Sequence, residues 1–315
     1  MGPLFFLLYV NDMVRASGEL GFVLFADDTN LYAEGPDPAG LFERVNRGLG
    51  DLGRWFRCNR LTLNLKKTEY VYFAGARPPE VPSGGLVFEG EQIRRVEGTE
   101  FLGVWVDAEL KWRGHIDQVG GKMRRLLGVL GRARADLNER LLISLYNSLV
   151  LPHLQYCLMV WGNFEADRNK AQGETLLKLQ KRFVGIIAGQ GGRYHADPLF
   201  AKYGILKVGD LYRQQLRMHA WKFHNDRLPD SQAAMLARVG ESHSYGTRAA
   251  RSGLTVSTGD RRLVGYRVPK EWGTLTEEQR AVASVAGFKR SSKGDFLVQY
   301  GTFRCGGAGC WVCGR

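Results

Sequence analysis

The chain has 315 residues, 44% of them hydrophobic and 24% charged, which is ordinary globular composition. Its formal net charge of +12 gives a surface that attracts polyanions, and nucleic acids or anionic membranes are the usual ones. Five cysteines are too few for a disulfide scaffold, and no apolar run reaches the ~18 residues that span a bilayer. The composition therefore excludes a small disulfide-rich secreted domain, and the sequence predicts no secretory signal or transmembrane segment.

The N-terminal region contains two apolar segments. Residues 2–10 lack the basic start of a secretory signal, and they predict a buried element. Residues 19–33 hold an apolar β-prone run that meets Asp27 and Asp28 and then resumes, which predicts a hairpin with an acidic tip. Ionised carboxylates in an apolar setting need a positive partner, and Mg²⁺ is a suitable one. A solvated Asp-Asp turn is the alternative interpretation.

The middle of the chain changes from mixed to helical patterning near residue 110. Apolar residues recur at helical spacing over residues 39–57, which predicts an amphipathic helix. Short strands are predicted at residues 69–74, 86–89, 92–96 and 101–107. Further helices are predicted at residues 114–134, 139–150, 172–188, 208–226 and 271–287. Residues 228–270, rich in Gly, Ser and Arg, predict a linker or a loosely ordered segment.

A basic face is predicted on the helix at residues 114–134. Lys122, Arg125 and Arg132 fall on one side of that helix. Such a face neutralises backbone phosphates, which gives salt-dependent binding without sequence readout. A solvated helix face is the alternative, although the excess of one sign of charge argues against it.

Several motifs, in the same order along the chain, resemble those of reverse transcriptases from jockey-like non-LTR (LINE) retrotransposons. Residues 25–28, Phe-Ala-Asp-Asp, resemble the aromatic-x-Asp-Asp signature, and residues 2–12 resemble the segment before it. Residues 64–68 resemble the next block, and residues 101–104 resemble the primer grip. The resemblance extends to about residue 190. Each motif alone is weak, and their order makes the set specific.

The resemblance implies roles for individual residues. Asp27 and Asp28 would bind Mg²⁺ in a two-metal site, and Lys67 would assist the leaving group of nucleotidyl transfer. The residues implied to hold the primer are Phe101, Leu102 and Gly103. The implied partners are an RNA template, a DNA primer and deoxynucleoside triphosphates, with no membrane. The implied location is the nucleus or the cytoplasm.

The implied fold is α+β: a partial polymerase palm, followed by an all-helical thumb and a C-terminal extension. The palm is expected to hold an antiparallel sheet with the Asp-Asp hairpin and a packed helix. The predicted segments are a partial palm at 1–110, a helical thumb at 111–190, a helical extension at 191–227, the linker at 228–270 and a C-terminal segment with a Cys-rich end at 271–315.

The catalytic set implied by the resemblance has three aspartates, and no counterpart of the first one precedes Met1. We therefore expect little or no polymerase activity from this chain alone, and an unpaired sheet edge that lowers its solubility. Two rival hypotheses are a non-catalytic nucleic-acid-binding remnant that uses the basic thumb face, and a structural protein whose charge serves only solubility.

Three cysteines lie close together near the C-terminus. Cys305, Cys310 and Cys313 could bind Zn²⁺, but such a site commonly has four ligands. The spacing therefore favours unpaired reduced cysteines over a zinc site.

Overall fold

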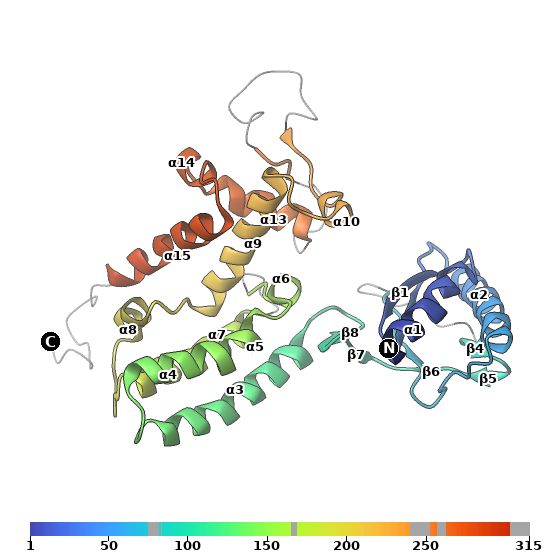
Figure 1. The fold of residues 1–315 in the computed structure, drawn as a ribbon, viewed down its shortest axis with the longest axis horizontal. Helices are drawn as coiled ribbons and strands as arrows, with labels where there is room; N and C mark the ends of the chain where they lie inside the picture. Colours follow the sequence, from blue (N-terminus) through green and yellow to red (C-terminus); the bar gives the residue numbers. More distant parts are fainter. Residues whose placement is uncertain (75–81, 83, 165–168, 240–252, 257–262, 303–315) are drawn as a thin grey trace. The chain divides into compact units, whose positions relative to one another are not determined.

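The computed structural model describes residues 1–74, 82, 84–164, 169–239, 253–256 and 263–302 (Figure 1). The chain divides into two compact units, Met1–Leu110 and Lys111–Arg315. The first unit mixes helices with short strands and the second is helical, which agrees with the predicted α+β class.

The first unit is built from short elements. They are α1 (Gly2–Val10), η1 (Asn11–Arg15), β1 (Gly21–Phe25), β2 (Asp28–Tyr32), α2 (Pro38–Cys58), β3 (Glu69–Tyr70), β4 (Val87–Phe88), β5 (Glu91–Gln92), β6 (Arg94–Arg95), β7 (Gly98–Phe101) and β8 (Val104–Asp107). Antiparallel pairs join β1 to β2, β4 to β5 and β7 to β8, whereas β3 runs parallel to β6. The described strands therefore form four two-stranded sheets rather than one continuous antiparallel sheet. The reason is their length, because β3, β4, β5 and β6 have two residues each.

Helix α2 organises the core of the first unit, and it confirms the helix predicted at residues 39–57. Its N-cap is Asp37, whose carboxylate accepts a hydrogen bond from the Gly40 amide at 2.6 Å. Its apolar face buries Phe56, whose ring meets the ring of Phe88 edge-on at 6.0 Å. The hairpin residues of β1 and β2 that face inward pack on the same cluster.

The prediction of a buried element at residues 2–10 is wrong. These residues form the helix α1, and Phe5 and Leu8 are 63% and 66% exposed. Helix α1 is apolar on every side, a pattern typical of a buried helix, but the first unit packs only against its C-terminal end. Only its last residue, Val10, is buried, and with Met13 it joins the core.

The described part of the second unit consists of helices and one isolated β-bridge, between Arg238 and Leu254. The helices are α3 (Arg113–Ala133), α4 (Glu139–Leu145), η2 (Tyr146–Val150), α5 (Leu151–Gln155), α6 (Leu158–Trp161), α7 (Lys170–Ile187), α8 (Ala196–Tyr203), α9 (Val208–His224), α10 (Asp230–Ala233), α13 (Val264–Gly273), α14 (Glu277–Arg280) and α15 (Val285–Gly301). The helices predicted at 114–134, 172–188 and 208–226 are confirmed as α3, α7 and α9. The helix predicted at 139–150 continues from α4 into a π-helical turn, η2.

The single helix predicted at residues 271–287 is wrong. Helix α13 ends at Gly273, and α14 starts after Thr276, which forms a capping box with Gln279. Helix α15 then starts after Ser284, whose side chain accepts a hydrogen bond from a main-chain amide. Two N-caps therefore divide the predicted span, and apolar periodicity alone does not reveal them.

The interior of the second unit is one continuous hydrophobic cluster that includes Trp161, Trp221 and Trp272. The side chain of Gln180 lies inside it and is fully buried. Its amide donates to a main-chain oxygen of Leu206 at 3.1 Å and accepts from the main-chain amide of Val208 at 2.7 Å. Gln180 thereby fixes the start of α9 against α7.

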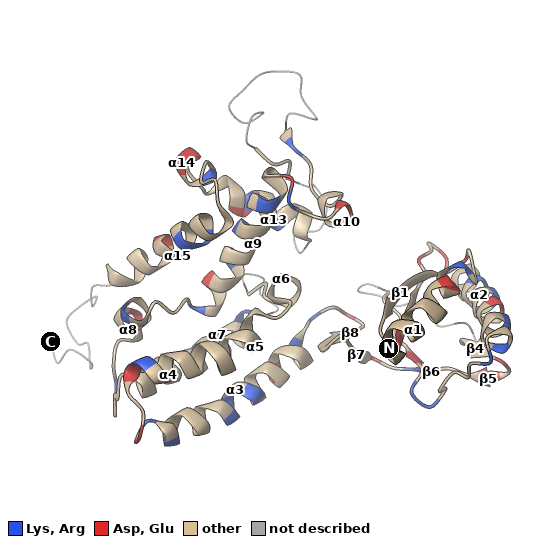
Figure 2. Ribbon diagram, in the orientation of Figure 1, with Lys and Arg blue, Asp and Glu red and all other residues tan. Residues whose placement is uncertain are grey.

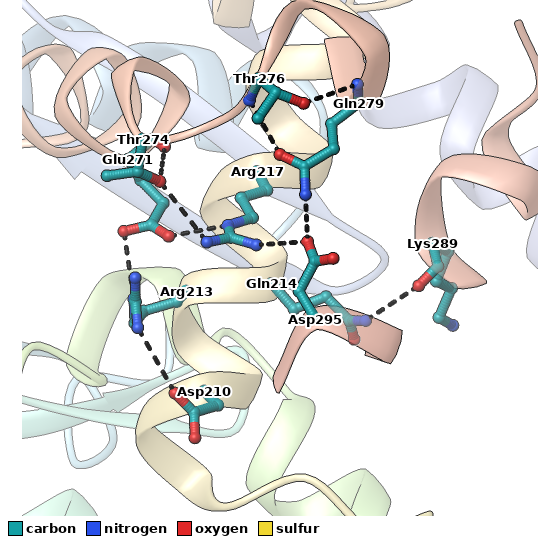
Figure 3. A network of polar contacts seen from close by, with 10 residues as sticks. All are labelled: Asp210, Arg213, Gln214, Arg217, Glu271, Thr274, Thr276, Gln279, Lys289 and Asp295. Atoms are coloured by element: carbon teal, nitrogen blue, oxygen red, sulfur yellow. Dashed lines mark hydrogen bonds and ion pairs between the residues drawn. The ribbon is translucent and has the colours of Figure 1, made fainter. Parts of the chain in front are cut away.

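A polar network attaches the C-terminal helices to α9 (Figure 3). Arg217 of α9 donates to Glu271 of α13 at 2.8 Å and pairs with Asp295 of α15 at 3.3 Å. Gln279 of α14 donates to the same Asp295 carboxylate at 2.8 Å. Arg213 also reaches Glu271, at 3.2 Å. Residues 271–302 are therefore part of the same folded unit as α9.

The segment predicted as a linker, 228–270, is partly structured where it is described. It contains α10, the isolated antiparallel β-bridge between Arg238 and Leu254, and the first residues of α13. Residues 240–252 and 257–262 of this segment lie outside the described part of the chain.

Candidate active site and nucleic-acid interface

The acidic hairpin of the first unit is formed by β1 and β2, as predicted. Phe25 and Asp28 form the last cross-strand pair, so Ala26 and Asp27 make a two-residue turn. Ala26 has a φ of 52°, in the left-handed region that L-residues rarely adopt. The tight turn places two carboxylates next to each other at the tip.

The two faces of this hairpin have different surroundings, because side chains alternate along a strand. Phe22, Leu24 and Leu31 face the core of the first unit and pack against it. Asp28 shares the other face with its partner Phe25, which is 61% exposed. Asp28 thus has an aromatic neighbour on a face that is open to solvent.

Asp27 and Asp28 are both exposed. This corrects the expectation that an apolar setting makes a compensating positive charge necessary, because water already solvates both carboxylates. Within the described residues, neither carboxylate has a side-chain partner in an ion pair or hydrogen bond. Two free, adjacent carboxylates fit a magnesium ion, which takes one or two protein carboxylates and leaves its other positions to water and phosphate oxygens.

Lys67 lies in a compact loop just before β3. The Asn64 carbonyl accepts hydrogen bonds from the main-chain amides of Lys67 and Thr68, at 3.0 and 3.1 Å. The Lys67 side chain is exposed, and the structure does not bring it into an ion pair with Asp27 or Asp28. The loop fixes the main chain of Lys67 and leaves its ammonium group available.

The predicted primer-contact residues form the tip of the β7–β8 hairpin. Phe101 pairs with Val104, and Leu102 and Gly103 make the two-residue turn between them. Their φ values are 46° and 78°, which is the combination that a type I′ turn requires. Gly103 is therefore suited to the turn itself, because glycine adopts a positive φ without steric cost.

Glu69 connects the lysine loop with this hairpin, and the sequence motifs did not single it out. One carboxylate oxygen accepts from the Thr99 hydroxyl of β7 at 2.6 Å. The other pairs with Arg94 of β6 at 2.6 Å. Because β3 starts at Glu69, these bonds tie the chain just after Lys67 to the base of the β7–β8 hairpin. The sequence around Glu69 contains no pattern that predicts its contacts with Arg94 and Thr99.

The basic face lies on α3 in the second unit (Figure 2). Lys122, Arg125 and Arg132 are all exposed, on the side of the helix opposite Met123 and Leu130, which are fully buried. No carboxylate pairs with any of the three within the described residues. These three cations are therefore available to an external anion.

The described residues contain no group of three or more His, Cys, Asp or Glu side chains placed to hold a metal ion. Cys305, Cys310 and Cys313, proposed as possible zinc ligands, lie outside the described residues, and Cys58 and Cys157 are exposed free thiols. In the part of the chain that is described, no helix is both long and apolar enough to cross a bilayer.

Sequence comparison finds that the chain is similar to RNA-directed DNA polymerases and to a Pol polyprotein of mobile elements, which supports the resemblance of its ordered motifs to reverse transcriptases of the non-LTR retrotransposon kind. It is 24% identical over 273 residues to the RNA-directed DNA polymerase from mobile element jockey of Drosophila funebris, and 21% identical over 236 residues to that of Drosophila melanogaster. It is also 26% identical over 169 residues to a Pol polyprotein from the type-1 retrotransposable element R1 of Bradysia coprophila.

The extent of these matches is unequal. They cover 84%, 70% and 51% of this chain, in the same order, but only 28%, 25% and 16% of the relatives. The chain thus spans about a quarter of the length of the two jockey proteins. No family model and no solved structure matches it.

Proposed function

We propose that this chain contributes the C-terminal portion of the palm and the thumb to an RNA-directed DNA polymerase of a non-LTR retrotransposon. Similarity to the jockey polymerases over 84% of the chain carries the proposal. Two free carboxylates at the tip of a tight hairpin support it chemically. The first unit then corresponds to the palm and α3 to α7 to the thumb.

The proposed reaction is nucleotidyl transfer. The 3′ hydroxyl oxygen of the primer attacks the α-phosphorus of a nucleoside triphosphate, and pyrophosphate leaves. Asp27 and Asp28 would hold Mg²⁺, which when bound supplies charge neutralisation to the attacking and leaving oxygens. Lys67 would protonate or neutralise the leaving pyrophosphate. The β7–β8 tip, at Phe101, Leu102 and Gly103, would support the primer end.

We further propose that the 315-residue chain alone extends primers poorly, if at all. The three-aspartate set implied by the resemblance has matching positions here only for Asp27 and Asp28. Two carboxylates leave the metals and the incoming triphosphate with too few ligands.

Metal binding and primer extension test this proposal separately. Manganese, a paramagnetic substitute for magnesium, should broaden the NMR signals of the hairpin first, and added magnesium should reverse the effect. The double variant Asp27→Asn, Asp28→Asn should abolish the broadening. Glu43→Gln, an exposed acid on α2, is the matched control and should leave it unchanged. Equal broadening in the two variants would rule out the hairpin as the metal site.

Primer extension on an RNA template should be indistinguishable between the wild-type chain and the Asp27→Asn, Asp28→Asn variant. Clear extension by the wild type that the variant loses would refute the proposed inactivity, while it would strengthen the assignment of the two carboxylates.

The second candidate function is nucleic-acid binding without catalysis. The uncompensated cations of the α3 face favour it. Replacing Lys122, Arg125 and Arg132 with alanine should weaken binding to an RNA–DNA hybrid. It should also make the affinity less dependent on salt concentration, by about one unit of log–log slope for each phosphate that these residues neutralise. The control variant Lys270→Ala, Lys289→Ala, Arg290→Ala removes the same charge from exposed sites elsewhere in the unit, and it should have a much smaller effect.

A further inference from the structure

A histidine lies at the edge of the basic face, on helix α5. Helices α5 and α3 pack together, and Leu154 of α5 is buried in the same core as Met123 of α3. His153 directly precedes Leu154 and is partly exposed. It is therefore located where α5 meets the part of α3 that carries Lys122 and Arg125.

Among the described residues, the charged groups that act on His153 are Lys122 and Arg125, which are both positive. Burial, and then the charges of Lys122 and Arg125, lower the pKa of the His153 imidazole. The imidazole is therefore mostly neutral at neutral pH. Within the described residues, His153 has no hydrogen-bond or ion-pair partner, so its ring nitrogens remain available.

Acidic groups on the neighbouring elements do not offset this charge. Helix α3 has one acid, Asp117, and it lines a small cavity of about 160 Å³ between α3 and α7 together with Arg124. The π-helical turn η2 has no charged residue. Its one titratable side chain, Tyr146, is buried and accepts a hydrogen bond from Gln180.

Helix α9 also packs against α5, through Gln215, whose side-chain amide donates to a main-chain oxygen of α5 at 2.9 Å. The titratable residues one turn away from Gln215 are Tyr212, which is buried, and His219, which is partly buried. The one acid of α9, Asp210, accepts a hydrogen bond from Tyr300 of α15. The described parts of the elements around His153 thus present cations and neutral groups to it.

We propose that Lys122, Arg125 and His153 form one binding site for a backbone phosphate of a nucleic acid, and that His153 takes up a proton when the phosphate binds. This inference rests on the proposed nucleic-acid binding by the α3 face and adds a proton-linked residue to it. The proton comes from the solvent, and the protonated imidazole then donates a charge-assisted hydrogen bond to a phosphate oxygen. A phosphate offsets the repulsion from Lys122 and Arg125 that otherwise disfavours the protonated form.

The test is the pH dependence of binding by the full chain to a short RNA–DNA hybrid at constant ionic strength. Between about pH 6 and pH 8, the wild-type affinity should fall roughly five- to tenfold, because binding is coupled to one proton. The variant His153→Gln should show a nearly flat profile. NMR titration of the His153 ring should show a higher pKa with the hybrid than without it.

The matched control is His224→Gln. His224 is also partly buried and has a lowered pKa, first through burial and then through Arg238, but it lies at the far end of α9, where its ring centroid is 5.5 Å from that of Trp272. This variant should keep the wild-type pH profile. The inference is overturned if His153→Gln keeps that profile too, or if wild-type binding depends on salt but not on pH. Absence of any binding at low salt would overturn the proposed interface together with the inference.

Discussion

The side-chain amide of Gln180 donates a hydrogen bond to the hydroxyl of Tyr146, 2.9 Å away, and both side chains are fully buried. Burial raises the pKa of the Tyr146 hydroxyl well above its ordinary value, so the phenol stays protonated. The side-chain oxygen of Gln180 also accepts a hydrogen bond from the main-chain amide of Val208, in the first turn of α9, at 2.7 Å. A single side chain therefore joins η2, α7 and α9 in the interior of the second unit.

We expect Gln180→Leu to destabilise the second unit by about 3 kcal/mol, because it leaves buried polar groups at Tyr146, Leu206 and Val208 without a partner. Gln172→Leu, on the same helix, is the control. The buried Oε1 of Gln172 has no partner within the described residues, so its replacement should cost little or nothing. Thermal or urea unfolding measures both. Equal losses would contradict the role given to Gln180.

Arg217 and Arg213 both reach Glu271, but they differ in burial. The side chain of Arg217 is 7% exposed and that of Arg213 is 31% exposed. Arg217→Met should cost about 3–5 kcal/mol, because it leaves the buried Glu271 and the partly buried Asp295 short of positive charge. Arg213→Met should cost about 1 kcal/mol or less. Urea midpoints of the two variants distinguish the expectations, and similar midpoints would disprove them.

Two glycines of α2 should respond to alanine in opposite directions. A Cβ at Gly48 would come within 2.6 Å of the Leu20 side chain, which is buried, whereas a Cβ at Gly50 would meet nothing within 4 Å. Gly50→Ala should stabilise the first unit by about 0.5–1 kcal/mol through helix propensity. Gly48→Ala should lose that gain and cost about 1 kcal/mol, because Leu20 must move. If Gly48→Ala stabilised the first unit as Gly50→Ala is expected to, the core would accommodate the added methyl group and the expectation for Gly48 would be wrong.

Acid should destabilise the second unit through its histidines. Burial, and then Lys222, lower the pKa of His219 below its ordinary value of 6.5. The unfolded chain then binds a proton more readily than the folded one, so stability is complete above pH 6.5 and is lost as the pH falls through the folded pKa. The Tm of the wild type should therefore drop below that pH. His219→Gln should make the Tm less dependent on pH in this range. An unchanged dependence would assign the acid sensitivity to other groups.

Sequence patterns predicted the elements that depend on local periodicity. The apolar spacing of α2, α3, α7 and α9 is regular enough to reveal each helix, and the run up to Asp27 revealed the hairpin. Helix α15 was missed because its apolar residues do not form one clear stripe, and its start is set by the cap at Ser284. Local caps of this kind override periodicity over short distances.

The candidate site could be predicted only as residue types. The motifs identified Asp27, Asp28 and Lys67, but their exposure depends on which face of each element meets the core, and this is a tertiary property. Glu69 escaped notice because its partners, Arg94 and Thr99, are distant in sequence. No motif in the sequence surrounds His153, and its position beside the basic face follows only from the packing of α5 against α3.

Helix α15 limits how the protein can be shortened for study. Phe296 and Tyr300 are buried in the core of the second unit, and the Tyr300 hydroxyl accepts a hydrogen bond from the Lys207 amide at 3.2 Å. A recombinant product that stopped before Val285 would leave Trp221 without Phe288, the ring stacked on it at 5.9 Å. Such a product would expose aromatic rings to water and aggregate, so expression designs need to retain the chain through Gly301.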